Sequence, residues 1–172
     1  GMLRPTSGRI VISGTDIYDL DARQRAEFRA SSIGFVFQMF HLIPYLDVLE
    51  NVLLGISNRS VSGDRDRDRA EQLIKRLGIC SRKTHRPSEL SAGERQRAAI
   101  ARALINKPKL ILADEPTGNL DSENASEVVG HLADYRAEGG TVIMVTHGSA
   151  ADQTADRIIR MENGGFVLAG TT

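Results

Sequence analysis

Short apolar runs alternate with longer amphipathic segments along this chain, and the alternation predicts most of its elements. Uninterrupted apolar runs that end at glycine or polar residues are typical of buried strands, and we expect strands at residues 9–13, 33–37, 109–113 and 141–146. Apolar positions spaced by three and four residues favour helices, which we expect at residues 21–30, 47–54, 64–77, 92–105 and 122–138. Near the end, residues 157–162 and 166–169 flank Asn163-Gly164-Gly165, which predicts a hairpin.

Two of the helices carry well-defined apolar faces. In residues 64–77 the face consists of Ala70, Leu73, Ile74 and Leu77, and Gly78 follows as a stop signal. In residues 92–105 it consists of Ala99, Ile100, Ala103 and Leu104. Because strands and helices alternate from residue 109 to residue 161, we expect an α/β fold with a parallel sheet covered by helices. The length of 172 residues and the lack of an internal repeat predict one domain.

Composition narrows the class of protein. Acidic and basic residues balance at 22 each, so nothing indicates a general affinity for nucleic acid or anionic lipid. A lone Cys80 fits a reducing compartment, and no apolar run approaches the roughly 20 residues of a membrane helix. His41, His85 and His131 are dispersed and have no metal-ligand spacing. We therefore expect a soluble intracellular protein.

Two acidic residues end the strand at residues 109–113. Neighbouring strand residues face opposite ways, so Asp114 and Glu115 cannot share one task. One carboxylate can hold a hydrated Mg²⁺ while the other faces an attacking water, a division that phosphoryl transfer requires. The alternative is an acidic turn after an ordinary strand.

A second motif, Leu90-Ser91-Ala92-Gly93-Glu94, opens the helix at residues 92–105. A helix start with free N–H groups and a serine hydroxyl suits a terminal phosphate. The same letters also describe a capping box, in which Ser91 caps the helix and Glu94 reaches back. Both interpretations can hold together.

Two further side chains follow buried strands. Gln38 comes directly after residues 33–37, and His147 comes directly after residues 141–146. Taken alone, each is more often structural than functional. The apolar segment of residues 39–44 suits either a partner surface or local packing.

Together these motifs resemble the ATP-binding subunit of an ABC transporter, in the lipoprotein-release and macrolide-export subgroup. The resemblance is carried by Gly34-Phe35-Val36-Phe37-Gln38, by Leu90-Ser91-Ala92-Gly93-Glu94 and by Ala113-Asp114-Glu115-Pro116-Thr117-Gly118-Asn119-Leu120-Asp121. It implies a P-loop NTPase type of parallel sheet with helices on both faces. It also implies a helical signature subdomain at about residues 48–106, followed by residues 107–172 with the paired acids and the switch histidine.

The resemblance also implies roles, cofactors and partners. Asp114 and Gln38 would serve Mg²⁺, and Gln38 would also have a catalytic role by contacting the attacking water. Glu115 would be the general base, and His147 would be a catalytic residue that contacts the terminal phosphate of ATP. Nucleotide-binding residues supplied to a second subunit would be Ser91, Ala92, Gly93, Glu94 and Asp121. The implied partners are a transmembrane permease subunit and a second ATP-binding subunit in a homodimer or heterodimer, at the inner face of the cell membrane, with no nucleic acid. The chain departs from the family at Ala92, Glu94 and Gly148, where Gly, Gln and Asp are usual.

The phosphate-cradling motif Gly-x-x-x-x-Gly-Lys-Ser/Thr does not occur in the 172 residues, because none of the four lysines follows a glycine. We therefore expect an N-terminally truncated domain with uncertain activity of its own. The strand before that loop would lie between residues 141–146 and 157–162, so we also expect a rearranged sheet or a dimer that pairs the open edges. The alternatives are a module that retains only its dimerisation and partner surfaces, and a soluble ABC-type ATPase unrelated to transport.

Overall fold

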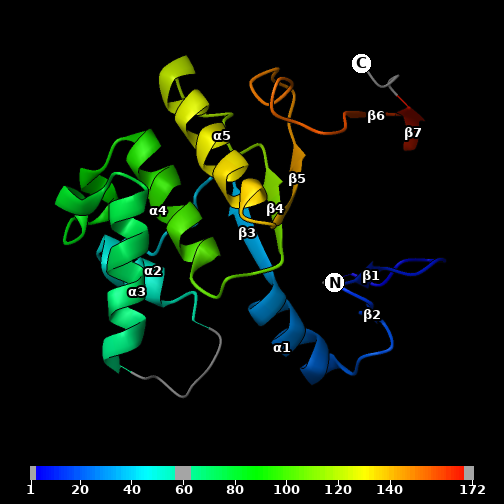
Figure 1. The fold of residues 1–172 in the computed structure, drawn as a ribbon, viewed down its shortest axis with the longest axis horizontal. Coiled ribbons are helices and arrows are strands. Elements are labelled where there is room, and N and C mark those ends of the chain that lie inside the picture. The colour runs from blue at the N-terminus through cyan, green and yellow to red at the C-terminus, as the bar shows by residue number, and fades with distance from the viewer. Residues whose placement is uncertain (1–2, 57–62, 169–172) are drawn as a thin grey trace.

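A three-stranded parallel sheet forms the centre of the chain, as a computed structural model of residues 3–56 and 63–168 shows (Figure 1). Its order is β3 (Ile33–Phe37), β4 (Leu110–Asp114) and β5 (Thr141–Val145). The predicted strands agree with these bounds to within one residue, and the predicted parallel pairing is confirmed.

The helices are α1 (Ala22–Ser32), α2 (Val48–Leu53), α3 (Gly63–Arg76), α4 (Ala92–Leu104) and α5 (Ser122–Ala137), with short 3₁₀ turns η1 (Cys80–Arg82) and η2 (Pro87–Glu89). Four of the α-helices begin at a polar residue whose side chain accepts the N–H of the third helical residue, and these caps are Asp21, Asp47, Ser91 and Asp121. Such caps satisfy N–H groups that have no acceptor within the helix. No helix among the described residues is long and apolar enough to cross a membrane.

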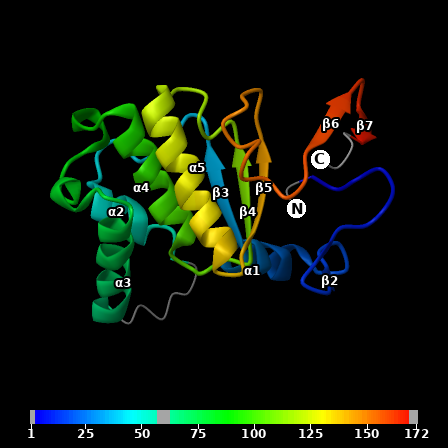
Figure 2. The same cartoon turned by 45° about the horizontal axis from the view of Figure 1, so that its top comes forward.

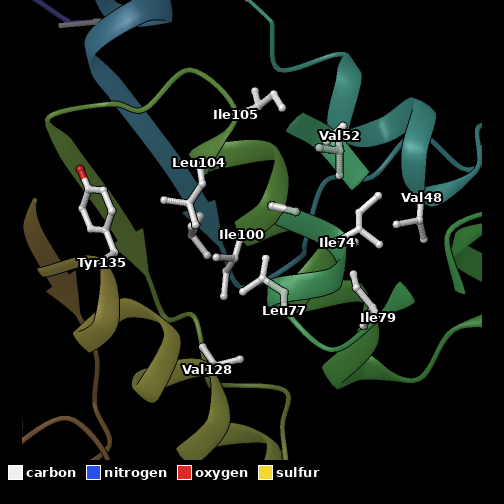
Figure 3. Packing of buried hydrophobic residues seen from close by; sticks show 14 of the residues in the cluster. Val48, Val52, Ile74, Leu77, Ile79, Ile100, Leu104, Ile105, Val128 and Tyr135 are labelled. Carbon is white, nitrogen blue, oxygen red and sulfur yellow. The ribbon is translucent and has the colours of Figure 1, made fainter. Parts of the chain in front are cut away.

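The core lies between one face of the sheet and helices α4 and α5, with α2 and α3 beyond α4 (Figure 2). Figure 3 shows Leu77, Ile100 and Val128, which belong to this cluster. Helix α4 is more deeply buried than its predicted face, because Ala98 and Ala101 are also inaccessible. Small residues permit this close packing: a Cβ atom at Gly34 would lie 2.7 Å from the carbonyl oxygen of Ala103.

The other face and the outer edge of the sheet are more open. The rings of Phe35 and Phe37 stack on this face, and the side chains of Ile143 and Val145 on β5 are exposed. Within the described residues β5 pairs only with β4.

Two antiparallel hairpins stand apart from the sheet, namely β1 (Val11–Ile12) with β2 (Thr15–Asp16) and β6 (Ile159–Glu162) with β7 (Gly165–Leu168). The predicted strand at residues 9–13 is thus shorter, because Ser13 and Gly14 turn the chain with positive φ. Asn163 and Gly164 make the predicted turn, also with positive φ. Strands β5 and β6 belong to different sheets, and rearrangement of the central sheet relative to the family stays a prediction. Pairing of its edges in a dimer stays a prediction.

Candidate functional site

The three strands of the sheet end at one common edge, which we call the carboxyl edge. The register pairs Phe37 with Asp114 and Asp114 with Val145, so the residues that follow the strands emerge side by side. This edge brings together four of the predicted site residues, which are Gln38, Asp114, Glu115 and His147.

Glu115 has the most constrained position at the carboxyl edge. Its backbone has a φ of 45°, a conformation that residues other than Gly, Asn and Asp rarely adopt. Its N–H donates to the carbonyl oxygen of Val145 at 2.8 Å. The Thr146 hydroxyl donates to Oε2 of Glu115 at 3.3 Å. Oε1 lies 3.5 Å from Nε2 of His147 and, although buried, accepts no hydrogen bond within the described residues. The carboxylate is 19% exposed and the imidazole 97% exposed, so the pair connects a shielded acid to solvent.

Asp114 differs from its neighbour in exposure. It is the exposed last residue of β4, and its carboxylate forms no hydrogen bond or ion pair with another described side chain. The two neighbouring acids therefore differ in exposure, since one carboxylate is solvated and the other is shielded, and their division of roles stays a prediction. In the described part of the chain, no three or more His, Cys, Asp or Glu side chains are grouped so that they could hold a metal ion.

The loop after Glu115 fixes Gln38. The Gly118 N–H donates to the carbonyl oxygen of Glu115 at 3.1 Å, and Nδ2 of Asn119 donates to the carbonyl oxygen of Gln38 at 3.1 Å. A Cβ atom at Gly118 would lie 2.7 Å from Nε2 of Gln38. The amide of Gln38 thus lies against the loop that carries the two acids, and Gly118 leaves room for it.

The start of α4 is a capping box. Oγ of Ser91 accepts the Glu94 N–H at 3.2 Å, and the Glu94 carboxylate accepts the Ser91 N–H at 2.7 Å. Nε of Arg82 donates to the same carboxylate at 2.8 Å. The backbone hydrogen bond from Ser91 and then that from Arg82 hold the pKa of Glu94 below its ordinary value. Because the first N–H groups of a helix have no intrahelical acceptor, those of Ala92 and Gly93 remain suited to an anion.

Gly93 is required where α4 meets the start of α5. It is buried, and a Cβ atom there would clash with Oδ1 of Asn124. Nδ2 of Asn124 donates to the carboxylate of Asp121 at 2.9 Å, while Nη1 of Arg97 donates to Oδ1 of Asn124 at 3.1 Å. The Asp121 carboxylate also accepts the Asn124 N–H, and this backbone hydrogen bond, followed by the one from the Asn124 side chain, lowers the pKa of Asp121. Asp121 is therefore a helix cap in this chain, whatever it contacts in a second subunit.

Sequence reasoning did not single out Gln96, which is one of two fully buried polar residues in the described ranges; the other is Asn51. The Gln96 side chain is inaccessible to solvent, and Nε2 donates to the carbonyl oxygen of Pro116 at 2.6 Å. This bond joins the helix that begins at Ser91 to the loop that follows Glu115. The sequence does contain a sign of this burial, because Gln96 precedes Ile100 by four residues and therefore lies on the apolar face of α4.

Residues 39–44 combine local packing with exposure. The Arg102 guanidinium donates to the carbonyl oxygens of Phe40 and His41, and the buried Asn51 bonds both the N–H and the carbonyl oxygen of Ile43. Met39 stays largely exposed. The backbone of the segment is therefore fixed from within, and part of its apolar surface is free.

This fold and site define the class of the protein. The parallel sheet, the paired acids at its carboxyl edge and the capped helix start are those of a P-loop NTPase of the ABC ATPase type. A solved structure of the ATP-binding cassette MJ0796, described as dimeric and bound to ADP and Pi, superposes with a TM-score of 0.84 and 39% identity over 95% of this chain and 72% of that one. The structure of cbiO1 from Clostridium perfringens gives a TM-score of 0.88 with 33% identity, covering 99% of this chain and 68% of that one.

The chain belongs to the ABC transporter family, whose sequence profile, described as "ABC transporter", matches residues 1–118. It is 45% identical to the lipoprotein-releasing system ATP-binding protein LolD of Maricaulis maris, over 94% of this chain and 71% of that protein. It is also 45% identical to the macrolide export ATP-binding/permease protein MacB of Rhodopseudomonas palustris, over 94% of this chain but only 25% of that protein. The chain thus spans about a quarter of MacB. The predicted family and fold class are confirmed.

Proposed function

We propose that the chain is the ATP-binding and ATP-hydrolysing subunit of an ABC transporter, in which hydrolysis drives a membrane permease partner. One observation carries the proposal: Oε1 of Glu115 is buried, accepts no hydrogen bond from a described residue, and lies 3.5 Å from His147. A shielded carboxylate oxygen without a donor is suited to take a proton from an attacking water. The Thr146 hydroxyl holds the other oxygen and so orients the acid.

The neighbouring residues fit the remaining tasks of phosphoryl transfer. The Asp114 carboxylate is solvated and has no partner among the described side chains, so its oxygens are available to Mg²⁺, which proteins usually hold through one or two carboxylates, phosphates and water. When bound, Mg²⁺ neutralises charge on the transferred phosphate. Gln38 would contribute its amide oxygen to the metal shell. His147, almost fully exposed, would donate a hydrogen bond to the terminal phosphate.

The signature residues would act on the nucleotide of a second subunit. In this proposal Ser91, Ala92, Gly93 and Glu94 present a helix start to the phosphate, and Asp121 lies at the subunit junction. Residues 48–106 would form the signature subdomain and residues 107–172 the part with the paired acids and the switch histidine. The exposed side chain of Met39 would contribute to the permease contact at the inner face of the membrane.

A second candidate function follows from the missing phosphate loop. None of the four lysines in the 172 residues follows a glycine, so the backbone cradle and the lysine that bind the phosphates of ATP are not supplied by these residues. In this candidate the chain is a module that offers dimerisation and permease-binding surfaces without holding ATP by itself.

Calorimetry with Mg-ATP separates the two functions. The first predicts saturable binding in the micromolar range, together with hydrolysis that Glu115→Gln lowers by about 10²–10⁴-fold while binding is kept. Glu162→Gln, on the exposed strand β6, is the matched control and should change neither. Absence of any binding heat would overturn the first function for this chain and support the second.

A further inference from the structure

A groove lies at the end of the sheet opposite to the carboxyl edge, and we call it the basal groove. It has a volume of about 930 Å³ and is lined by one side of α3 from Arg65 to Arg76, the connection from α4 to β4, the turn from α5 to β5, and Ser13. Lys109 precedes β4 and Thr141 begins β5, whereas Asp114 and Val145 end these strands. The basal groove is therefore separated from Glu115 and His147 by the length of the sheet.

Positive charge predominates in the basal groove. Its lining includes five cationic side chains, which are Arg65, Arg69, Arg76, Lys107 and Lys109, and two acidic ones, which are Asp68 and Glu138. Glu138 is already paired with Arg76 at 2.7 Å. Arg65, Lys107 and Lys109 form no ion pair with any residue in the described ranges. This local excess contrasts with a chain of zero net charge.

The backbone that carries the two lysines is held firmly. The Lys107 N–H donates to the carbonyl oxygen of Leu104 at 2.9 Å, and the Lys109 N–H donates to that of Ser32 at 3.0 Å. Between them, the Tyr135 hydroxyl donates to the carbonyl oxygen of Pro108 at 2.7 Å. The backbone of both lysines is thus fixed between α4 and β4, so a ligand has to order only their side chains, which limits the entropy cost of binding.

Arg69 adds a partly buried cation. Its guanidinium donates to the carbonyl oxygen of Leu104 at 3.4 Å, and burial lowers its pKa despite the opposing influence of Asp66. A guanidinium that has lost part of its hydration gains more from an anion than a solvated one. Beside it, Leu73, Leu104 and Tyr135 give the basal groove an apolar wall.

We propose that the basal groove binds a phosphorylated organic molecule of about nucleotide size, independently of the function proposed above. Arginine and lysine are the side chains that recognise phosphate, and the apolar wall accepts a carbon skeleton. The volume lies within the roughly 300–1,000 Å³ of small-molecule sites. A ligand seated there touches α3, α4 and α5 together and fixes the helices relative to the sheet.

The test is calorimetry and amide NMR without nucleotide or Mg²⁺, with fructose 1,6-bisphosphate, inorganic tripolyphosphate and sulfate as probes. The bisphosphate is expected to bind more tightly than sulfate and to shift the amides of Lys107 and Lys109. Replacing both lysines by alanine should weaken this binding about tenfold. The matched control Lys75→Ala with Arg160→Ala removes the same charge outside the basal groove and should leave binding unchanged.

Four results would overturn the proposal or the ligand class that it names. One is equal affinity in the Lys107/Lys109 double variant, and another is an equal loss in the control, which would indicate only a diffuse effect of net charge. The third is a shift of the Gln38 and His147 amides in place of those of Lys107 and Lys109. Binding of tripolyphosphate without binding of the bisphosphate would overturn the organic ligand class. Failure of Mg-ATP binding has no bearing on these outcomes, because the probes contain no nucleotide.

Discussion

Helix α4 and strand β5 are both rich in apolar residues, yet the protein buries them very differently. Ala98 and Ile100 on α4 are inaccessible to solvent, whereas Ile143 and Val145 on β5 are 53% and 59% exposed. Helix α4 packs against β3, α2, α3 and α5, while β5 has β4 on one edge and α5 on one face. The burial of an apolar element therefore depends on how many of its sides are covered by other parts of the described chain.

The difference in burial between α4 and β5 is tested most directly by replacing one isoleucine in each element with alanine. We expect Ile100→Ala to lower the free energy of unfolding by about 2–5 kcal/mol, because it leaves a cavity in the core. We expect Ile143→Ala to lower it by no more than about 1 kcal/mol, because half of that side chain already contacts water. Urea unfolding followed by circular dichroism measures both. Equal losses would mean that β5 is as well packed in solution as α4.

A second change tests the polar contact inside the core. Gln96→Leu keeps the approximate volume but leaves the carbonyl oxygen of Pro116 without its donor, so the free energy of unfolding should fall by about 1–3 kcal/mol. Gln72→Leu on the exposed side of α3 is the control and should change it by less than about 0.5 kcal/mol. A loss no larger than that of the control would show that the bond to Pro116 adds nothing to the joint between α4 and the loop after Glu115.

The sequence predicted the sheet strands and helices well, because their patterns are local. A strand such as Ile33–Phe37 is an apolar run with a polar stop, and α4 begins at a serine with glutamate three residues on. The contacts between elements were not predictable in this way. Gln96 donates a hydrogen bond to Pro116, which lies 20 positions further along the chain, and no local sequence pattern connects the two residues.

The same distinction applies to the candidate site. Gln38, Glu115 and His147 were singled out because each lies at the end of a buried strand and matches a motif of the resembled family, and the structure places all three at one edge of the sheet. The sequence does not show that Asn124 excludes a side chain at position 93. This contact depends on how α5 approaches α4. The turn at Ser13 was missed for a similar reason, since serine rarely adopts a positive φ.

A third change probes the junction at the start of α4. Gly93→Ala should lower the free energy of unfolding by about 1–2 kcal/mol, because the methyl group displaces Asn124 from Asp121 and Arg97 and outweighs the better helix propensity of alanine. The double variant with Asn124→Ala should recover most of the loss that Gly93→Ala adds, since it removes the clashing amide. A double-mutant cycle by thermal unfolding gives the coupling energy. Strictly additive losses would contradict the contact.

The smallest expected effect concerns the ion pair of Glu94 with Arg82 at the start of α4. Glu94→Gln preserves a side-chain oxygen for the capping box but removes the ion pair with Arg82, and should lower the free energy of unfolding near neutral pH by less than about 1 kcal/mol. Glu89→Gln is the matched control, because its carboxylate also accepts a backbone N–H but forms no ion pair with a described arginine.

The pH dependence of the Glu94 effect has a definite sign. The folded protein holds the pKa of Glu94 below its ordinary value, so the carboxylate stabilises the fold fully above the pKa of the unfolded chain. This contribution is lost as the pH falls through the lower, folded pKa. Wild type and Glu94→Gln should therefore differ in stability at neutral pH and converge in acid, as urea unfolding at several pH values will measure. A difference that persists below the folded pKa, or one that Glu89→Gln reproduces, would assign the effect to side-chain packing and not to the charge of Glu94.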